Sequence, residues 1–203
     1  MPEDCIFHCR TKRLSSSSSL RSWAKIWLLA LQHPRTDMAP ITFEASLPHP
    51  DDTDKLGARL ADAVSNEAAC VTDHGLAIRL QGNLGAGKTS LVRAMLRRFG
   101  FAGAVKSPTF SLVETYPIGA LTLNHFDFYR FEEPEEFEDA GFRDLFGPGF
   151  ICATEWTEKA APYVPEADLI VELELEGLGR HAVLKACTPL GESIVSRVLE
   201  TSK

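Results

Sequence analysis

The sequence predicts an α/β fold in which helices flank a central sheet, and three observations support this prediction. Strand-like apolar segments alternate with segments of helical periodicity from Ile41 onward. One strand-like segment, "GLAIRLQG" (75–82), runs into a glycine-rich loop and then into a helical pattern at 88–100. The chain has 203 residues, 44% of them hydrophobic and 24% charged, which is the composition of an ordinary globular domain with a full core.

The first elements follow from local patterns. "ITFEASL" (41–47) alternates in hydrophobicity like a short strand, and the prolines of "LPHP" end it. The segment 51–68 has apolar residues at helical spacing on one face and aspartates at its start, where carboxylates favour the helix dipole. The strand 75–82 is short and apolar, and the helix 88–100 after it is ended by Gly100.

The second half of the chain contains mostly strand patterns. "FSLVETYPI" and "LTLNHFDFYRF" predict two strands separated by Gly119, and an acidic helix follows them. "FICATEW" predicts a short buried strand. The remaining elements are a hairpin around "EGLGR", formed by 168–177 and 180–188, and a closing helix at 191–200. Strands mixed with helices in this way are typical of a three-layer α/β sandwich.

Residues 1–37 differ in composition from the rest of the chain. They contain a serine run and an apolar patch from Trp23 to Leu31, which is far shorter than the ~20 residues that cross a bilayer. No small-residue cleavage site follows the patch, so a targeting peptide is disfavoured. We predict that 1–37 form a disordered extension, with Met38 the natural start of a mis-assigned chain, and that 38–203 form one domain.

The loop "GNLGAGKT" (82–89) matches the pattern of a phosphate-binding loop, G-x-x-x-x-G-K-[ST]. Its glycines let successive backbone N–H groups turn towards phosphate oxygens, and the following helix adds its positive end. Lys88 is expected to reach the β- and γ-phosphates, and the hydroxyl of Thr89 is expected to bind Mg²⁺. The predicted fold is therefore the three-layer P-loop NTPase sandwich, with a mixed and largely parallel central sheet. The phosphate-binding residues would be Gly85, Ala86, Gly87, Lys88, Thr89 and Ser90.

A P-loop protein needs further carboxylates, one near the magnesium ion and one to orient the attacking group. In "NHFDFYR", a period of two places His125, Asp127 and Tyr129 on one side of a strand. Glu155 follows the buried strand "ICAT", where a second acid is expected. Each residue also has a purely structural interpretation, Asp127 as a capped strand end and Glu155 as a strand terminus. Because no N-K-x-D or T-K-x-D signature for guanine occurs, the predicted nucleotide is ATP.

The net charge of −7 argues against unaided binding to nucleic acid, which needs a basic surface. "FEEPEEFEDA" (131–140) concentrates six carboxylates, which favours a solvated helix face or, alternatively, a docking surface for a basic partner. The five cysteines have no metal-ligand spacing. They predict free thiols in a reducing, cytoplasmic compartment, with no disulfide and no structural metal.

Taken in order, "GNLGAGKT", "VKSPTFSLVETY", "HFDFYR", "EDAGFRDLF" and "EW" resemble the TsaE (YjeE) family. The resemblance runs from about Ile41 to the C-terminus. It implies a small Mg²⁺-dependent ATPase that takes part in the biosynthesis of N6-threonylcarbamoyladenosine at position 37 of tRNA. It implies that the protein binds the TsaB–TsaD heterodimer, in which TsaD is the transferase, and meets tRNA only through these partners, without a membrane.

The resemblance also implies roles for individual residues. Lys88, Asp127 and Glu155 would be catalytic, with Thr89 and Glu155 associated with the metal. Trp156 would lie beside the nucleotide, and Thr53 and Arg180 match weaker positions that contact it. Thr109 of "SPTF" would lie in a switch-like loop and sense the γ-phosphate. The chain departs from the family at Ala153-Thr154, where larger aliphatic residues are usual; Thr154 either loosens the packing of the strand or bonds its backbone.

Two other functions remain open from the sequence. A small-molecule kinase uses the same loop, but it usually carries a lid with several arginines, and here only "RAMLRR" is rich in arginine. A nucleotide-sensing module would keep the loop while Asp127 and Glu155 were merely structural. For an ATPase, Arg130 is the candidate arginine finger within the chain.

Overall fold

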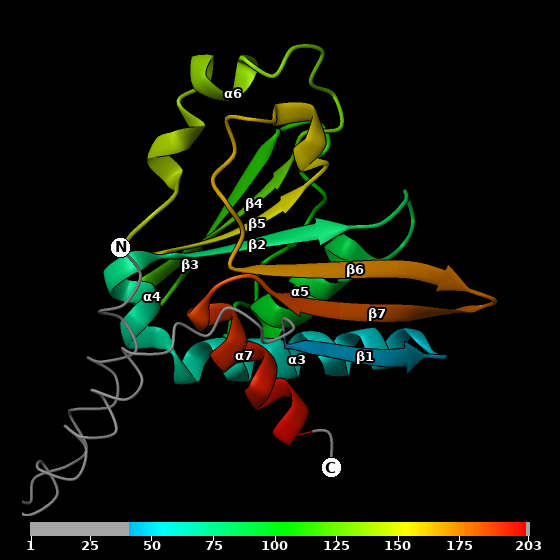
Figure 1. Ribbon diagram of the computed structural model, residues 1–203. Coiled ribbons are helices and arrows are strands. Elements are labelled where there is room, and N and C mark those ends of the chain that lie inside the picture. Colours follow the sequence, from blue (N-terminus) through cyan, green and yellow to red (C-terminus); the bar gives the residue numbers. More distant parts are fainter. Residues whose placement is uncertain (1–40, 202–203) are drawn as a thin grey trace, which may run out of the picture.

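The computed structural model describes residues 41–201. The predicted extension at 1–37 lies outside the described residues. The described part of the chain forms one seven-stranded sheet with helices on its faces (Figure 1). The sheet consists of β1 (Thr42–Leu47), β2 (Leu76–Gln81), β3 (Val113–Ile118), β4 (Leu121–Asp127), β5 (Phe150–Glu155), β6 (Leu169–Glu176) and β7 (Gly179–Ala186).

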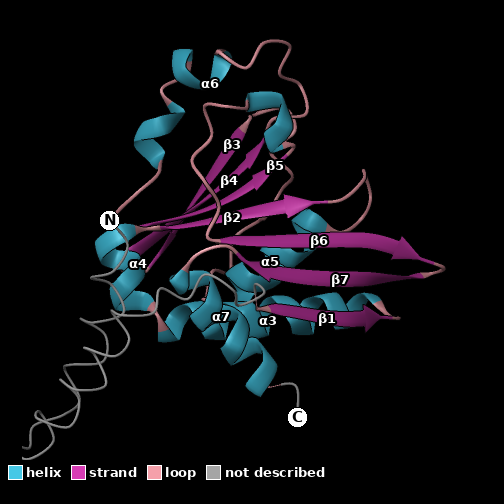
Figure 2. Cartoon of the chain, in the orientation of Figure 1, coloured by secondary structure: helices cyan, strands magenta, loops and turns pink. Residues whose placement is uncertain are grey.

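The strand order is β1-β7-β6-β2-β5-β4-β3, so the strand that enters the glycine loop lies at the centre of the sheet. The pairs β6–β2, β2–β5 and β5–β4 are parallel. The pairs β1–β7, β7–β6 and β4–β3 are antiparallel. The predicted mixed sheet is confirmed, with its parallel pairs in the centre and antiparallel strands at both edges (Figure 2).

The long helices are α3 (Pro50–Asn66), α5 (Lys88–Arg98) and α7 (Pro189–Glu200). Their buried faces join the apolar side chains of β2, β5, β6 and β7 in the larger hydrophobic core. The helices α3 and α5 cross closely at Gly57, where a Cβ atom would lie 2.6 Å from the Cβ of Ala94. Further along the same pair, Arg98 contacts the carboxylate of Asp62, so the two helices run in the same direction.

Over β4 and β5, the opposite face of the sheet is covered by three short helical segments, α6 (Glu136–Asp139), η1 (Phe142–Leu145) and η2 (Thr157–Ala160). Their side chains pack on the second hydrophobic cluster, which is rich in phenylalanine and includes Phe126 and Phe128 of the β4 end. The rings of Phe126 and Phe142 meet edge to face with centroids 5.4 Å apart. Because the two clusters lie on opposite faces, the fold has the predicted three layers.

Local patterns gave several boundaries incorrectly. The predicted strand 121–131 ends at Asp127, because the Asp127 carboxylate accepts a hydrogen bond from the Tyr129 backbone N–H (3.0 Å) and replaces the next ladder bond. A further helix, α4 (Ala68–His74), follows α3 without having been predicted. At the junction, the Glu67 carboxylate accepts bonds from Ser193 and Arg197 of α7, which no local pattern indicates.

The acidic segment 131–140 forms an internally bonded cap instead of one regular helix. The Glu136 carboxylate accepts the backbone N–H groups of Glu132 and Glu133, which holds its pKa below the usual value. Glu138 pairs with Arg143, and Glu135 accepts from the hydroxyl of Tyr163. Half of the carboxylates in the segment therefore have partners within the chain.

Cys152 is a buried free thiol and Cys187 an exposed one. Cys70 is disulfide-bonded, so the prediction that the chain has no disulfide is wrong at this residue. Within residues 41–201, no helix combines the length and the apolar character needed to cross a membrane.

Candidate nucleotide site

The glycine loop connects the end of β2, at Gln81, to the start of α5, at Lys88. Gly82 and Gly87 have φ angles of 137° and 107°, which side chains other than glycine rarely adopt. A Cβ atom at Gly82 would also lie 2.2 Å from the carbonyl oxygen of Leu173. The first N–H groups of α5 have no partner within the helix, so the loop presents backbone donors at a positive helix end.

Lys88 is 5% exposed and lies against its own loop. Its Nζ donates to the carbonyl oxygens of Gly82 (2.6 Å) and Asn83 (3.2 Å). The same ammonium lies 5.1 Å from the ring centroid of Trp156 and 3.5 Å from Oε2 of Glu155. Lys88 is thus held over the loop by neutral acceptors, a ring and one distant carboxylate.

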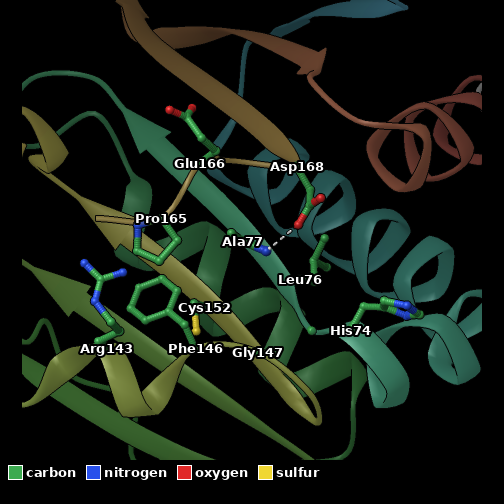
Figure 3. Close-up of a pocket in the computed structure, with 11 residues that line it drawn as sticks. His74, Leu76, Ala77, Arg143, Phe146, Gly147, Cys152, Pro165, Glu166 and Asp168 are labelled. Carbon is green, nitrogen blue, oxygen red and sulfur yellow. Dashed lines mark hydrogen bonds between the residues drawn. The ribbon is translucent and has the colours of Figure 1, made fainter. Parts of the chain in front are cut away.

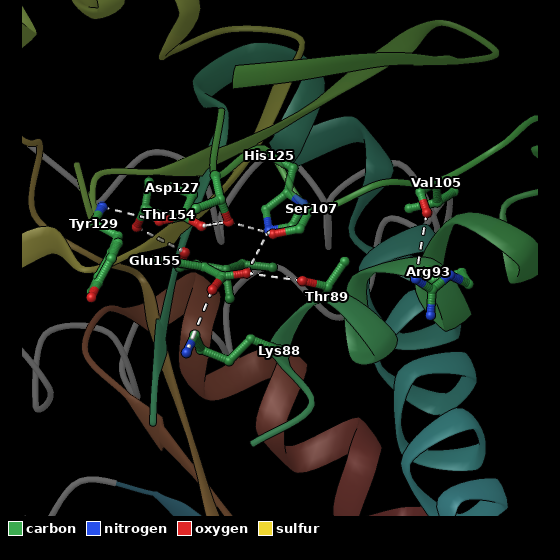
Figure 4. A network of polar contacts seen from close by, with 12 residues as sticks. Lys88, Thr89, Arg93, Val105, Ser107, His125, Asp127, Tyr129, Thr154 and Glu155 are labelled. Carbon is green, nitrogen blue, oxygen red and sulfur yellow. Dashed lines mark hydrogen bonds and ion pairs between the residues drawn. The ribbon is translucent and has the colours of Figure 1, made fainter. Parts of the chain in front are cut away.

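Glu155, at the end of β5, contacts three side chains from two other elements, α5 and β4 (Figure 4). Its Oε1 lies 2.9 Å from Nε2 of His125 and 3.5 Å from the hydroxyl of Thr89. Thr89 is in the first turn of α5 and His125 is in β4. The fold therefore brings the carboxylate predicted from "ICATEW" onto the first turn of the loop helix.

Asp127 is the β4 partner of Glu155 in the parallel pair, and it is 3% exposed. The Thr109 hydroxyl donates to Asp127 Oδ2 at 2.6 Å, and the Ser107 hydroxyl lies 2.8 Å from that of Thr109. The other oxygen, Oδ1, accepts the N–H of Tyr129. The "SPTF" loop thus lies against the second predicted acid, and both oxygens of that acid are bonded.

Three other predicted residues lie around the loop. Arg180 of β7 donates from Nε to the Ala86 carbonyl at 2.9 Å. Trp156 has a φ of 57°, which turns the chain sharply after Glu155, and its ring meets Lys88. Thr53 is 2% exposed, and its hydroxyl has no hydrogen-bond partner among the described residues. Because Gly57 faces Leu91 and Ala94, Thr53 lies one helical turn nearer the loop.

The remaining predicted residues are Ser90, Arg130 and Thr154. Ser90 accepts from Arg93 within α5 at 3.5 Å. The guanidinium of Arg130 lies over the ring of Phe110, 4.2 Å from its centroid. The hydroxyl of Thr154 donates to the carbonyl of Ile78 on the neighbouring strand, so of the two alternatives it bonds backbone. The alternating pattern placed His125 on the same side of the strand as Asp127, but it did not predict the contact of His125 with Glu155.

Two clefts lie at opposite ends of the parallel strands. One, of about 340 Å³, lies at the start of β2 and is lined by residues that include His74, Arg143 and Cys152 (Figure 3). The other, of about 420 Å³, lies between the glycine loop and Leu173–Leu175 of β6. Ligands of open α/β sheets bind at the carboxyl ends of the strands, which is where the second cleft lies. The cleft at the start of β2 lies at the other ends of the strands and is therefore the less suitable nucleotide site.

Among residues 41–201, no group of three or more His, Cys, Asp and Glu side chains could hold a metal ion by itself. A Mg²⁺ ion does not need such a group, because it usually takes one or two protein oxygens and completes its shell with phosphates and water. The hydroxyl of Thr89 and the carboxylate of Glu155, 3.5 Å apart, are suitable oxygen donors. The residues present therefore fit a magnesium–nucleotide complex.

A parallel strand that enters a glycine loop, followed by a helix with Lys and Thr in its first turn, places the chain in the P-loop class of α/β proteins. The model of one family, described as threonylcarbamoyl adenosine biosynthesis protein TsaE, matches residues 47–182. The chain belongs to the TsaE family.

Individual relatives agree with this assignment. A protein of Haemophilus influenzae named tRNA threonylcarbamoyladenosine biosynthesis protein TsaE is 46% identical over 125 residues, which are 62% of this chain and 79% of the relative. Its namesake in Bacillus subtilis is 32% identical over 115 residues, 57% of this chain and 72% of the relative. The crystal structure of B. subtilis YdiB has the same fold, with a TM-score of 0.61 and 20% identity over 82% of this chain and all of YdiB.

Proposed function

We propose that this protein is the ATP-binding and ATP-hydrolysing component of the machinery that makes N6-threonylcarbamoyladenosine at position 37 of tRNA. One observation carries the proposal. Lys88 and Thr89 of the glycine loop meet Glu155, which is 66 residues further along the chain than Thr89. The names of the relatives support the assignment to tRNA threonylcarbamoyladenosine biosynthesis, and the contacts of Glu155 support nucleotide chemistry at the glycine loop.

The nucleotide would bind through its phosphates. The amides from Gly85 to Ser90 would bind phosphate oxygens, and Lys88 would exchange its carbonyl partners for the β- and γ-phosphates. The hydroxyl of Thr53, which has no hydrogen-bond partner within residues 41–201, and the ring of Trp156 support contacts further along the nucleotide. Arg180 already touches the loop at Ala86, so it would support the loop's conformation.

Thr89 and Glu155 would hold Mg²⁺, which when bound neutralises charge on the phosphates and so aids hydrolysis. Asp127 would orient the attacking water. It lies beside Glu155 on the neighbouring strand, and its hydrogen bonds go to Thr109 and Tyr129, whereas Lys88 contacts Glu155. For this role one Asp127 oxygen has to become available. Release of the Thr109 hydroxyl from Oδ2 would provide it, and Thr109 lies in the "SPTF" loop, for which the resemblance to the TsaE family implies a γ-phosphate-sensing role.

The protein would act with partners in the cytoplasm, where tRNA is modified. The net charge of −7 disfavours direct binding to tRNA, so contact through the TsaB–TsaD heterodimer is the arrangement that suits this chain. TsaD would be the transferase and this chain would supply ATP turnover.

Phosphate release, measured with and without TsaB–TsaD, tests the proposal. Wild type should release phosphate in a partner-stimulated reaction. Lys88→Ala should lose nucleotide binding, while Asp127→Ala should bind ATP but turn over about a hundredfold more slowly or worse. Lys55→Ala, on an exposed turn of α3, is the matched control and should behave as wild type.

The same assay identifies the two competing functions. A small-molecule kinase would release little phosphate until an acceptor was added, and a nucleotide sensor would release none with or without partners. In cells, depletion of the protein should abolish threonylcarbamoylation of tRNA, and Lys88→Ala should not restore it. Normal modification after depletion would overturn the proposal.

A further inference from the structure

His125 occupies a position at which packing alone does not require histidine. It lies in β4, is completely buried, and its Nε2 lies 2.9 Å from Oε1 of Glu155 (Figure 4). Its other ring nitrogen, Nδ1, is buried without a hydrogen-bond partner among residues 41–201. An apolar side chain of similar size would fill the same space without burying an unpartnered nitrogen, which costs free energy.

The unpartnered nitrogen also identifies the tautomer. A buried N–H without an acceptor is more costly than an unused lone pair, so the proton belongs on Nε2, where Glu155 accepts it. His125 then donates to the carboxylate through its Nε2–H. This bond orients Oε1 of Glu155, while the other oxygen, Oε2, has the longer 3.5 Å contact with Lys88.

The contacts of Glu155 differ in length. The bond to His125 is 2.9 Å, whereas Lys88 and Thr89 are each 3.5 Å away. Lys88 and Thr89 are also the two residues expected to turn to the nucleotide and its metal. When they do so, His125 remains as the short contact that sets the direction of the Glu155 carboxylate.

We propose that His125 is a positioning residue, which holds Glu155 in the orientation that Mg²⁺ requires. The inference rests on the proposed function, because it assumes that Glu155 serves the metal. Partners of metal-binding carboxylates commonly change metal affinity by about 10- to 100-fold when removed. His125 is expected to act in this range while leaving the phosphate contacts of the loop intact.

Mn²⁺ binding, followed by electron paramagnetic resonance in the presence of a non-hydrolysable ATP analogue, is the direct test. His125→Leu should weaken Mn²⁺ affinity about tenfold or more. Affinity for the analogue in EDTA, measured by calorimetry, should stay within about twofold because the loop is unchanged. His125→Gln, whose amide nitrogen occupies the place of Nε2, should retain Mn²⁺ affinity within about threefold.

Two further variants make the result decisive. His125→Asn is too short to reach Glu155 and should behave like His125→Leu, which covers the case in which leucine prevents folding. In a Glu155→Gln background, His125→Leu should cause no further loss of Mn²⁺ affinity, because the two residues act through one contact.

Mn²⁺ affinity unchanged in His125→Leu would overturn the inference and leave the proposed function standing. Equal losses of metal-free analogue binding in all three His125 variants would also overturn it, since that result indicates a structural role. Wild-type protein that bound neither the analogue nor Mn²⁺ would overturn the proposed function, and the inference with it.

Discussion

At the scale of single residues, the site is built from groups that already have partners. Lys88 donates to its own loop, and both oxygens of Asp127 accept hydrogen bonds. Glu155 is anchored through His125. Residues so constrained lose little further conformational freedom when a ligand binds, which is how a preorganised site limits the entropic cost of binding.

The cysteines provide a residue-scale prediction that is independent of function. Burial in the phenylalanine cluster raises the pKa of Cys152 to about 12, so at pH 8 only about one molecule in ten thousand carries its thiolate. Cys187 is exposed, although partial burial also raises its pKa. In native protein at pH 8, Ellman's reagent should modify Cys187 but not Cys152.

Two variants assign the reacting thiols. Cys187→Ser should remove one thiol from the native titration, whereas Cys152→Ser should leave the native count unchanged and lower only the count in denaturant. Rapid native modification of Cys152 would show that the β5 region opens far more readily than its burial indicates.

At the scale of elements, the packing of α3 against α5 depends on one small residue. Gly57 lies within a helix, where glycine is less favourable than alanine by about 1 kcal/mol. A Cβ at Gly57 would nevertheless lie 2.6 Å from the Cβ of Ala94 and 2.8 Å from the Leu91 carbonyl oxygen. Packing and helix propensity therefore predict opposite effects of substitution.

We expect packing to dominate at this position. Gly57→Ala should lower the free energy of unfolding by up to about 2 kcal/mol, because overpacking costs about 1–3 kcal/mol and the gain in helix propensity offsets about 1 kcal/mol of it. Urea denaturation measures the change. The double variant Gly57→Ala with Ala94→Gly should lose less stability than the sum of the losses of the two single variants, because it removes the closest contact of the new Cβ. A single variant more stable than wild type would contradict the expectation.

In the acidic segment 131–140, some of the carboxylates form hydrogen bonds within the fold. Glu135, Glu136 and Glu138 have bonds to Tyr163, to backbone N–H groups and to Arg143. Reversing all three charges should therefore reduce stability as well as any docking of TsaB–TsaD. Reversing Glu132, Glu133 and Asp139, for which no side-chain bond occurs in the described structure, separates the two effects.

We expect this second triple variant to keep the wild-type melting temperature and to bind TsaB–TsaD more weakly. Differential scanning calorimetry and a binding titration at low salt measure the two quantities. Unchanged affinity at unchanged stability would refute a docking role for the acidic segment.

At the scale of the whole molecule, the candidate nucleotide site lies where segments distant in sequence converge on the carboxyl edge of the parallel strands. The glycine loop comes from the β2–α5 junction, Glu155 from β5, and Asp127 from β4. A ligand bound across these segments should stabilise the entire fold, because unfolding any of them would release it.

We therefore expect ATP analogue with Mg²⁺ to raise the melting temperature. At a ligand concentration of about 100 Kd, the added stability is about 2.7 kcal/mol, which corresponds to a shift of about 5–10 °C in a domain of this size. Lys88→Ala should show little or no shift, and Lys55→Ala should show the full shift. Equal shifts in both variants would place the ligand elsewhere, for instance in the cleft at the start of β2.

The parts predicted from the sequence are those that local signals specify. The glycine loop, its strand and its helix follow from residue types within 82–89 and the periodicity on either side. Asp127 could be chosen because the alternation in "NHFDFYR" places it on the polar side of a strand, and Glu155 because it follows the apolar run "ICAT". The end of β4 and the helix α4 were missed, because a side-chain bond at Asp127 and contacts of Glu67 with α7 decide them.

By itself, the sequence determined the α/β class, the phosphate-binding loop and the candidate acids, since each depends on neighbouring residues. Only the tertiary structure decided the strand order β1-β7-β6-β2-β5-β4-β3, which places β4 and β5 beside the loop strand. It also decided that His125 bonds Glu155 and that Thr109 bonds Asp127. These contacts join residues 30 and 18 positions apart. They depend on how strands pair and how far side chains reach, which periodicity does not encode.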